Sequence, residues 1–161
     1  MKDSKVLFLC RAAIIAALYV VLTYVANALG LANGSVQVRF SEALTILPFF
    51  TPAAIPGLFV GCLLSNILTG CALPDIIFGS IATLLGALGT YALRKKSPWL
   101  APVAPIVANT VIVPFVLLYA YGVQPLWLSF ITVGAGEIIS CGILGMLLLF
   151  ALKKRAAALF N

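Results

Sequence analysis

The stretch LPDIIFGSIATLLGALGTYAL, from Leu73 to Leu93, decides the fold class of this chain. A membrane-spanning helix needs about 20 predominantly apolar residues, and this stretch reaches that length with Asp75 as its one carboxylate. The basic triplet Arg94-Lys95-Lys96 follows it directly. Because short loops rich in lysine and arginine stay on the cytoplasmic side of a membrane, the stretch predicts a helix that crosses the bilayer and ends at its inner face.

The rest of the chain has the same character. Of its 161 residues, 63% are hydrophobic and 9% are charged, and the mean hydropathy is +1.19. A soluble domain carries roughly a quarter charged residues, and a small one cannot bury this much apolar surface. We therefore expect an all-α integral membrane protein whose residues 1–161 form one domain in the lipid bilayer. The net charge of +6 does not indicate nucleic acid, because the basic residues cluster at helix ends.

Apolar segments along the chain predict a six-transmembrane-helix bundle. They cover approximately residues 6–29, 38–50, 53–68, 73–93, 98–121 and 125–152, with a turn around Asn33-Gly34. Six crossings that start inside place both termini, with the triplet Lys153-Lys154-Arg155, in the cytoplasm. The segment at 38–50 is short for a crossing, and a re-entrant segment there is the main alternative. Residues 12–28 also resemble a signal peptide, but we prefer a retained first helix because its removal would leave five segments.

Ionisable residues in apolar sequence indicate the working surface. A carboxylate near mid-membrane costs roughly 2.5–3.5 kcal/mol and usually marks a ligand or ion site, and Glu137 lies near the middle of the last segment. Arg39 and Glu42 share a helix face, either as a simple interfacial pair or as a ligand-binding pair. Asp75 follows Pro74 and serves either the helix N-terminus or a site. On the expected topology these groups converge on an outward-facing polar pocket.

Three further side chains complete the expected binding site. Asn66, towards the outer end of the third segment, and Asn109, near the middle of the fifth, either bridge helices or bind a ligand. Trp127, at the outer start of the last segment, belongs either to the aromatic belt of the membrane interface or to a stacking surface for a planar ligand. The expected substrate-binding residues are Arg39, Glu42, Asn66, Asp75, Asn109, Trp127 and Glu137.

Several classes of site are excluded by what the sequence lacks. The chain has no histidine, which rules out His-based metal sites, haem ligation by histidine and Ser-His-Asp triads. Its four cysteines form no C-x-x-C pair and suit apolar packing. A G-x-x-x-x-G-K-[ST] loop is also missing, so any nucleotide hydrolysis takes place in another chain. We expect no metal, no cofactor and no catalytic residue.

Small residues on the first segment predict close helix packing. Ala12 and Ala16, and likewise Ala13 and Ala17, form two overlapping small-x-x-x-small pairs. Such pairs let two helices approach closely. The partner is either another helix of the same chain or a separate membrane subunit.

Two stretches of the chain resemble the QueT family. They are Val38–Cys62, which contains the specific run R-x-S-E-A-L-T, and Ala72–Asp75 with Phe78-Gly79-Ser80. The resemblance extends over essentially the whole chain. QueT proteins are similar to the substrate-binding S components of energy-coupling factor (ECF) vitamin transporters. The resemblance implies a six-helix fold in a bacterial cell membrane, two cytoplasmic ATPases as partners, and a transmembrane coupling protein that docks on an alanine motif where Ala12, Ala13, Ala16 and Ala17 stand.

The family name also implies a substrate. Queuosine precursors are 7-deazaguanine bases with a cyano or an aminomethyl arm. A guanine-like edge offers adjacent N–H donors that a carboxylate can accept as a pair, so we hypothesise that Glu137 or Glu42 binds the ring edge and that Asp75 lies near the arm. The expected function is substrate capture for an ATP-driven importer, with no enzymatic activity in this chain. The alternative is a self-sufficient secondary carrier with Glu137 as its proton site, although the sequence shows no evident internal repeat of the kind many such carriers have.

Overall fold

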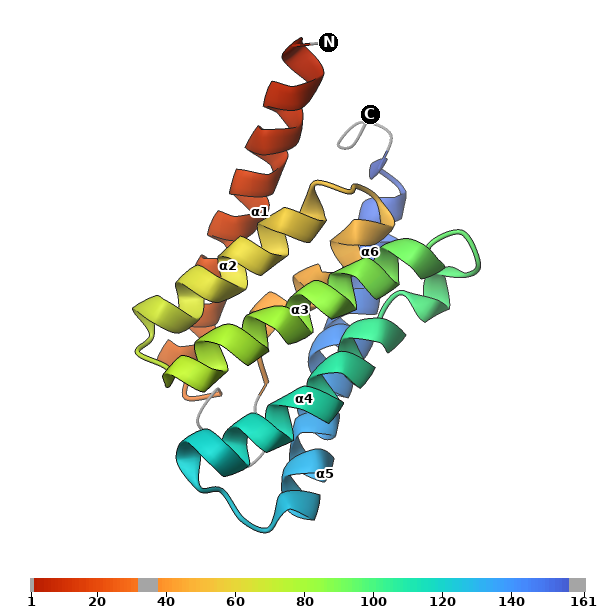
Figure 1. Ribbon diagram of the computed structural model, residues 1–161. Coiled ribbons are helices and arrows are strands. Elements are labelled where there is room, and N and C mark those ends of the chain that lie inside the picture. The colour runs from red at the N-terminus through yellow and green to blue at the C-terminus, as the bar shows by residue number, and fades with distance from the viewer. Residues whose placement is uncertain (1, 32–37, 157–161) are drawn as a thin grey trace.

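The computed structural model describes residues 2–31 and 38–156, and the regular structure within them is helical (Figure 1). The turn expected at Asn33-Gly34 lies outside the described residues. The elements are α1 (Lys2–Ala28), the 3₁₀-helix η1 (Phe40–Phe49), α2 (Ala54–Leu68), α3 (Leu73–Leu93), the 3₁₀-turn η2 (Pro98–Leu100), α4 (Val103–Tyr121), α5 (Leu126–Glu137), the π-helical η3 (Ile138–Leu144) and α6 (Gly145–Lys153). The all-helical fold expected from composition is confirmed.

Four apolar stretches of the described chain are long enough to cross a membrane. They are Ser4–Ala28 in α1, Leu73–Leu93 in α3, Pro98–Tyr121 across η2 and α4, and Leu126–Lys153 across α5, η3 and α6. Two shorter apolar helices accompany them, α2 with 15 residues and η1 with 10. This is the architecture of a multi-pass membrane protein, but the six crossings expected from the sequence are not confirmed.

The segment expected to form the second crossing is a buried 3₁₀-helix. At about 2.0 Å per residue, the ten residues of η1 extend roughly 20 Å, which is less than the ~30 Å of a bilayer's hydrocarbon core. Every residue from Ser41 to Pro48 is buried, and η1 packs against α1, α2, α3, η3 and α6. The apolar sequence of η1 therefore reflects burial inside the protein.

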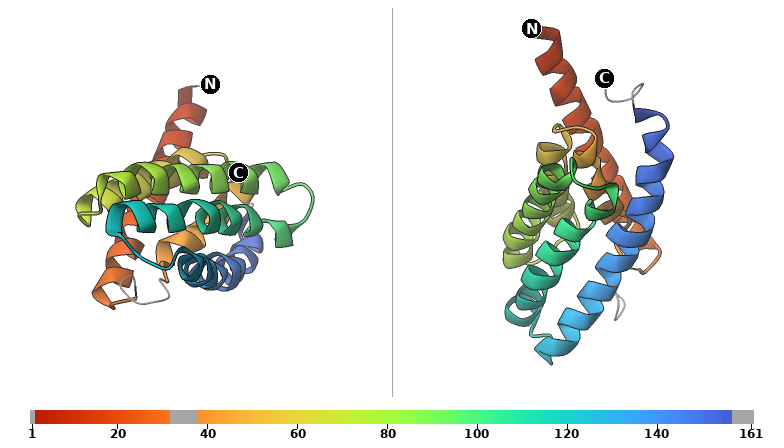
Figure 2. Two further views of the ribbon diagram at one scale, coloured as in Figure 1. Left: turned by 60° about the horizontal axis from the view of Figure 1, so that its bottom comes forward. Right: turned by 90° about the vertical axis from the view of Figure 1, so that its right-hand side faces the viewer.

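The two ends of the bundle carry different elements. α1 begins and α6 ends at the same end, where the first turns of α1 extend beyond the other helices (Figures 1 and 2). α5 begins at the opposite end, and α1, α2 and α4 end towards it (Figure 1). In between, α1 packs on α2, α2 on α3, and α3 on α4. The connection from α2 to α3, with Gly70 at φ +73°, therefore lies far from the start of α1.

Glycines of α2 allow α1 to lie very close to it. A Cβ atom on Gly57 would come within 2.7 Å of the carbonyl oxygen of Ala12, and one on Gly61 would come within 3.0 Å of Ala16 Cα. Small residues on both helices are what such an approach requires. Ala12 and Ala16 therefore pack within this chain.

The other alanine pair of α1 faces away from the bundle. Ala13 and Ala17 are both exposed. The structure thus splits the four alanines into a pair that packs on α2 and an exposed pair, and the exposed pair is the more accessible to a partner in the lipid.

Gly61→Ala is expected to destabilise the protein. The added methyl group would lie 2.8 Å from Tyr19 Cβ, so α1 and α2 would have to separate at a cost of about 1–3 kcal/mol. Thermal unfolding in detergent measures the effect as a lower melting temperature. Gly142→Ala is the matched control, because its nearest side-chain atoms would lie at an ordinary 3.8 Å. Equal melting temperatures for the two variants would contradict the close packing.

Candidate ligand-binding site

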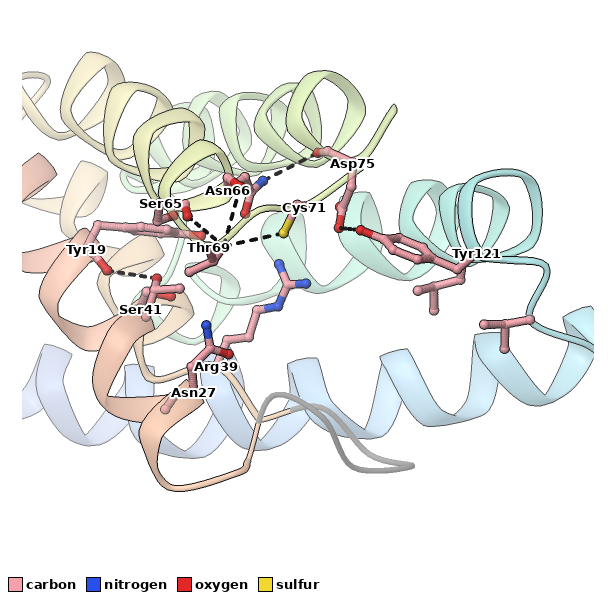
Figure 3. A pocket seen from close by; sticks show the side chains of 14 residues that line it. Tyr19, Asn27, Arg39, Ser41, Ser65, Asn66, Thr69, Cys71, Asp75 and Tyr121 are labelled. Atoms are coloured by element: carbon pink, nitrogen blue, oxygen red, sulfur yellow. Dashed lines mark hydrogen bonds between the residues drawn. The ribbon is translucent and has the colours of Figure 1, made fainter. Parts of the chain in front are cut away.

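A polar cavity of about 380 Å³, which we call the main cavity, lies between the second half of α1, the start of η1, the α2–α3 connection and the end of α4 (Figure 3). Its volume is in the range of small-molecule sites, roughly 300–1,000 Å³. It lies at the end of the bundle opposite to the start of α1. The described residues that line it are Tyr19, Thr23, Ala26, Asn27, Arg39, Ser41, Ser65, Asn66, Thr69, Cys71, Asp75, Leu117, Tyr121 and Val123.

Asp75 forms one wall of the main cavity. It lies in the first turn of α3, next to Pro74, whose fixed backbone angle suits a helix start. The Tyr121 hydroxyl donates a hydrogen bond to Asp75 Oδ2 at 3.2 Å, and Asn66 Nδ2 donates to the Asp75 carbonyl oxygen at 3.4 Å (Figure 3). Within the described residues no side chain donates to Asp75 Oδ1. The carboxylate is therefore fixed in place with one oxygen left for a ligand.

Arg39 supplies the positive charge of the main cavity. Its backbone is extended just before η1, and its N–H donates to Ser140 Oγ at 3.1 Å. Figure 3 shows the side chain reaching towards Cys71 and Asp75, and no described side chain accepts a hydrogen bond from the guanidinium. Burial lowers the pKa of Arg39, but Asp75 and other anionic neighbours outweigh burial, and the net pKa is raised. Arg39 is thus a permanent cation that faces the cavity.

A second cavity of about 10 Å³, the inner cavity, adjoins the main one at Arg39, which lines both. A volume of this size holds about one water molecule. The inner cavity brings together two acids that are far apart in the sequence, Glu42 and Glu137. Its lining residues are Arg39, Glu42, Gly79, Thr83, Asn109, Val113, Val133 and Glu137.

Glu42 is buried with both carboxylate oxygens occupied. The Tyr19 hydroxyl from α1 donates to Oε1, and Asn109 Nδ2 from α4 donates to Oε2 at 3.4 Å. The side chain is 2% exposed. Burial raises the pKa of Glu42, and the hydrogen bonds donated to the carboxylate partly offset this effect, because they favour the charged form.

Glu137 has a weaker set of partners. It is the last residue of α5, and Cys141 Sγ donates to its Oε2 at 3.1 Å. A thiol is a weak hydrogen-bond donor. The π-helical η3 begins at the next residue and carries Cys141, and π-helical turns are frequent at functional sites. Glu137 therefore lies in the same cavity as Glu42 with much less support for a negative charge.

The two carboxylates and Cys141 form a compact group. One oxygen from each acid and the Cys141 sulfur lie within 4.8 Å of one another. Metal ions bind the thiolate form of cysteine, whereas the Cys141 thiol donates its hydrogen to Glu137. The geometry is therefore that of two neighbouring buried acids, one of which accepts a hydrogen bond from the thiol. Two full negative charges 4.8 Å apart would repel each other by about 3.5 kcal/mol at an effective dielectric constant of about 20.

The structure distributes the expected binding residues over both cavities. Arg39, Asn66 and Asp75 line the main cavity, and Arg39, Glu42, Asn109 and Glu137 line the inner one. Trp127 lines neither cavity and is 63% exposed. Its stacking role stays a prediction that this arrangement does not favour.

Sequence reasoning missed several residues of the site, among them Tyr19, Ser41 and Cys141. Tyr19 is 1% exposed and reaches Glu42 from α1. Ser41 is fully buried, lines the main cavity, and has no hydrogen-bond partner for its Oγ within the described residues. A tyrosine in the middle of a predicted crossing, away from the interfaces where aromatic belts lie, was the available signal for Tyr19. A lone serine in an apolar run gives no such signal.

Comparison with known proteins supports the resemblance seen in the sequence. The model of the QueT transporter family matches residues 9–154. The queuosine precursor transporter QueT of Lactococcus lactis subsp. cremoris (strain MG1363) is 38% identical over 85 residues, which cover 53% of this chain and 50% of that protein. The match thus spans about half the length of that relative. No solved structure matches the chain. The extent of the family match shows that this chain belongs to the QueT transporter family.

Proposed function

We propose that this protein captures a queuosine precursor, a 7-deazaguanine base, in the main cavity and presents it for import. The observation that carries the proposal is a polar cavity of about 380 Å³, with Asp75 and Arg39 on its walls, in a chain of the QueT transporter family. The printed name of the relative, a queuosine precursor transporter, supports the same substrate class. The cavity has the size for a bicyclic base.

The proposed orientation of the base follows from the charges. An aminomethyl arm is a cation, and Asp75 is the acid that lines the main cavity. The ring edge then points towards Arg39, behind which Glu42 and Glu137 lie in the inner cavity. Because the inner cavity is too small for a ring, either acid could accept the edge only if the Arg39 side chain moved aside.

Calorimetric titration of the purified chain tests the proposal. The panel contains 7-aminomethyl- and 7-cyano-7-deazaguanine, guanine and several common vitamins. We expect saturable binding of a 7-deazaguanine and much weaker binding of guanine and the vitamins. Binding of a vitamin in preference to both deazaguanines would overturn the proposal.

Ser41→Ala is expected to change stability and binding in opposite directions. A buried hydroxyl without a partner costs roughly 1–3 kcal/mol, so its removal should leave the ligand-free protein as stable as the parent or more stable. If a ligand atom forms a hydrogen bond with this hydroxyl, the substitution removes that bond, and binding should weaken by about 3- to 10-fold. Thermal unfolding and titration measure the two effects. Unchanged affinity would remove Ser41 from the contact surface.

We also propose that the chain works with partners, as an S component does. Support comes from the sequence, which carries no nucleotide-binding loop, and from the accessible face of α1 with Ala13 and Ala17. On this proposal both termini lie in the cytoplasm and the main cavity opens outside, at the other end of the bundle. Co-purification with a transmembrane coupling protein and two ATPases is expected, and Ala13→Leu/Ala17→Leu should reduce it while Ala13→Ser/Ala17→Ser should not.

The buried acid pair favours a second candidate, a secondary carrier driven by protons. Glu42 and Glu137 resemble a proton site in being buried, close together and joined to a cavity. Uptake into vesicles that contain only this chain separates the two candidates. Accumulation driven by a pH gradient alone would establish the carrier, whereas a requirement for the ATPases and ATP would establish the S component.

A further inference from the structure

The charges around the two cavities do not balance. Among the described residues that line them, the charged side chains are one cation, Arg39, and three acids, Glu42, Asp75 and Glu137. All three acids are buried, with exposed fractions of 8% or less. An uncompensated charge buried in a protein is strongly unfavourable. If every acid were ionised, the site would hold two negative charges without a counterion.

The hydrogen bonds indicate which acid is neutral. Glu42 receives donors on both oxygens, from Tyr19 and Asn109, and Asp75 receives one from Tyr121. Among the described residues, Glu137 receives the weak thiol donor Cys141 and shares the Asn109 amide with Glu42. A like charge close by favours protonation of one member of a carboxylate pair, and the member with the poorest donors is the one that takes the proton.

Among the residues that the structure describes, no other titratable group that faces Glu137 alters this assignment. Glu137 faces Glu42 from η1, Arg39 from the residue just before η1, and Cys141 from η3. The neighbouring parts of α3 and α4 contribute Thr83 and Asn109, which do not titrate. Arg39 is the single cation in this set, and it lies between the inner pair and Asp75 because it lines both cavities.

We propose that Glu137 carries a proton in the ligand-free protein and releases it when a cationic ligand binds Asp75. A ligand cation neutralises Asp75, which leaves Arg39 to compensate for the inner pair, and the second inner acid can then ionise. One positive charge enters as ligand and one leaves as a proton, so the charge buried in the bundle does not change. The Ser41 hydroxyl, which lines the main cavity and has no hydrogen-bond partner among the described residues, offers a ligand there one further contact.

This inference rests on the proposed function and specifies how the same site discriminates between its two possible ligands. The aminomethyl base is a cation and should displace the proton. The cyano base has the same ring but is neutral, so it should bind without releasing a proton. A linked release of one proton makes affinity rise with pH, by up to tenfold per pH unit while the proton is bound in the free protein.

The test is calorimetric titration of the full chain with both bases, in buffers that differ in ionisation enthalpy and at several pH values. We expect about one proton released per aminomethyl base and none per cyano base. In Glu137→Gln, which cannot carry the proton, the aminomethyl base should bind with an affinity that does not depend on pH. Proton release that is absent from the parent, equal for both bases, or retained in Glu137→Gln would overturn the proposal.

An infrared measurement keeps the inference separate from the proposed function. A protonated buried carboxyl gives a carboxylic C=O stretch in the ligand-free protein, which should disappear in Glu137→Gln. If neither base binds, the proposed substrate is wrong, and this band alone decides whether Glu137 is protonated. Should Glu137→Gln fail to fold, Glu42→Gln replaces it, because the remaining acid has no like charge beside it and the pH dependence of binding should again be lost. Absence of the band from the parent protein would overturn the inference.

Discussion

Asp75→Asn is expected to weaken binding of 7-aminomethyl-7-deazaguanine by roughly thirty-fold to several-thousand-fold, or about 2–5 kcal/mol. The substitution keeps the shape of the side chain and leaves an oxygen to accept the Tyr121 hydrogen bond. It removes the negative charge that faces the main cavity, so the cationic arm of the ligand would be buried without its counterion. Calorimetric titration gives the affinity directly.

The cyano base is the control for this experiment. It has the same ring but no cationic arm, so Asp75→Asn should change its affinity less than tenfold. Unfolding temperatures of the ligand-free proteins show whether the variant keeps its fold. Equal losses for the two bases would contradict the placement of the arm at Asp75.

Arg39→Met should have the largest effect on stability. Methionine retains much of the apolar volume of the arginine stem but removes the one cation among the described residues that line the two cavities. Removal of one partner from a buried charge arrangement costs about 3–5 kcal/mol, because the remaining charges are uncompensated. We expect a much lower melting temperature in detergent near neutral pH.

Acidic pH and a second substitution test whether the stability loss in Arg39→Met comes from uncompensated negative charge. Protonation removes the excess negative charge, so the difference between Arg39→Met and the parent should shrink as the pH falls. Adding Glu42→Gln should restore part of the lost stability. Arg155→Met is the matched control, because Arg155 is exposed at the end of the bundle and a change there should stay within about 0.5 kcal/mol. A loss that is independent of pH would point to packing instead of charge.

The long helices could be predicted from the sequence because their signals are local. The helix from Leu73 to Leu93 has a proline in its first turn, an uninterrupted apolar run and a basic triplet at its end, and α3 has the same bounds. Hydropathy could not predict whether η1 crosses the membrane or is buried inside the protein, because both environments select the same apolar residues. Only the packing of α1, α3, η3 and α6 around η1 distinguishes the two.

The candidate site was predictable in its charges but not in its layout. Arg39 and Glu42 were expected to share one helix face. In the structure Arg39 precedes η1 in an extended conformation and reaches the main cavity, whereas Glu42 lies in the inner one. Because η1 begins after Arg39, Arg39 and Glu42 do not share a helix face, and their side chains point into different parts of the site. The proximity of Glu137 to Glu42 depends on how η1 packs against η3, and no spacing in the sequence contains that information.

The extra residue in η3 rotates α5 about the helix axis relative to α6, so the two halves of the last membrane stretch present different faces to the bundle. A π-helical turn contains one more residue than the α-helical turn that it replaces, so deletion of one residue between Ile138 and Leu144 would restore a regular α-helix. Everything before the deletion would then turn by about 100° relative to α6. Leu149 would keep its place in the core, while Glu137 would point towards lipid. The inserted residue therefore allows α6 to anchor the bundle and α5 to hold an acid inside it, two tasks that a straight helix of the same composition could not perform together.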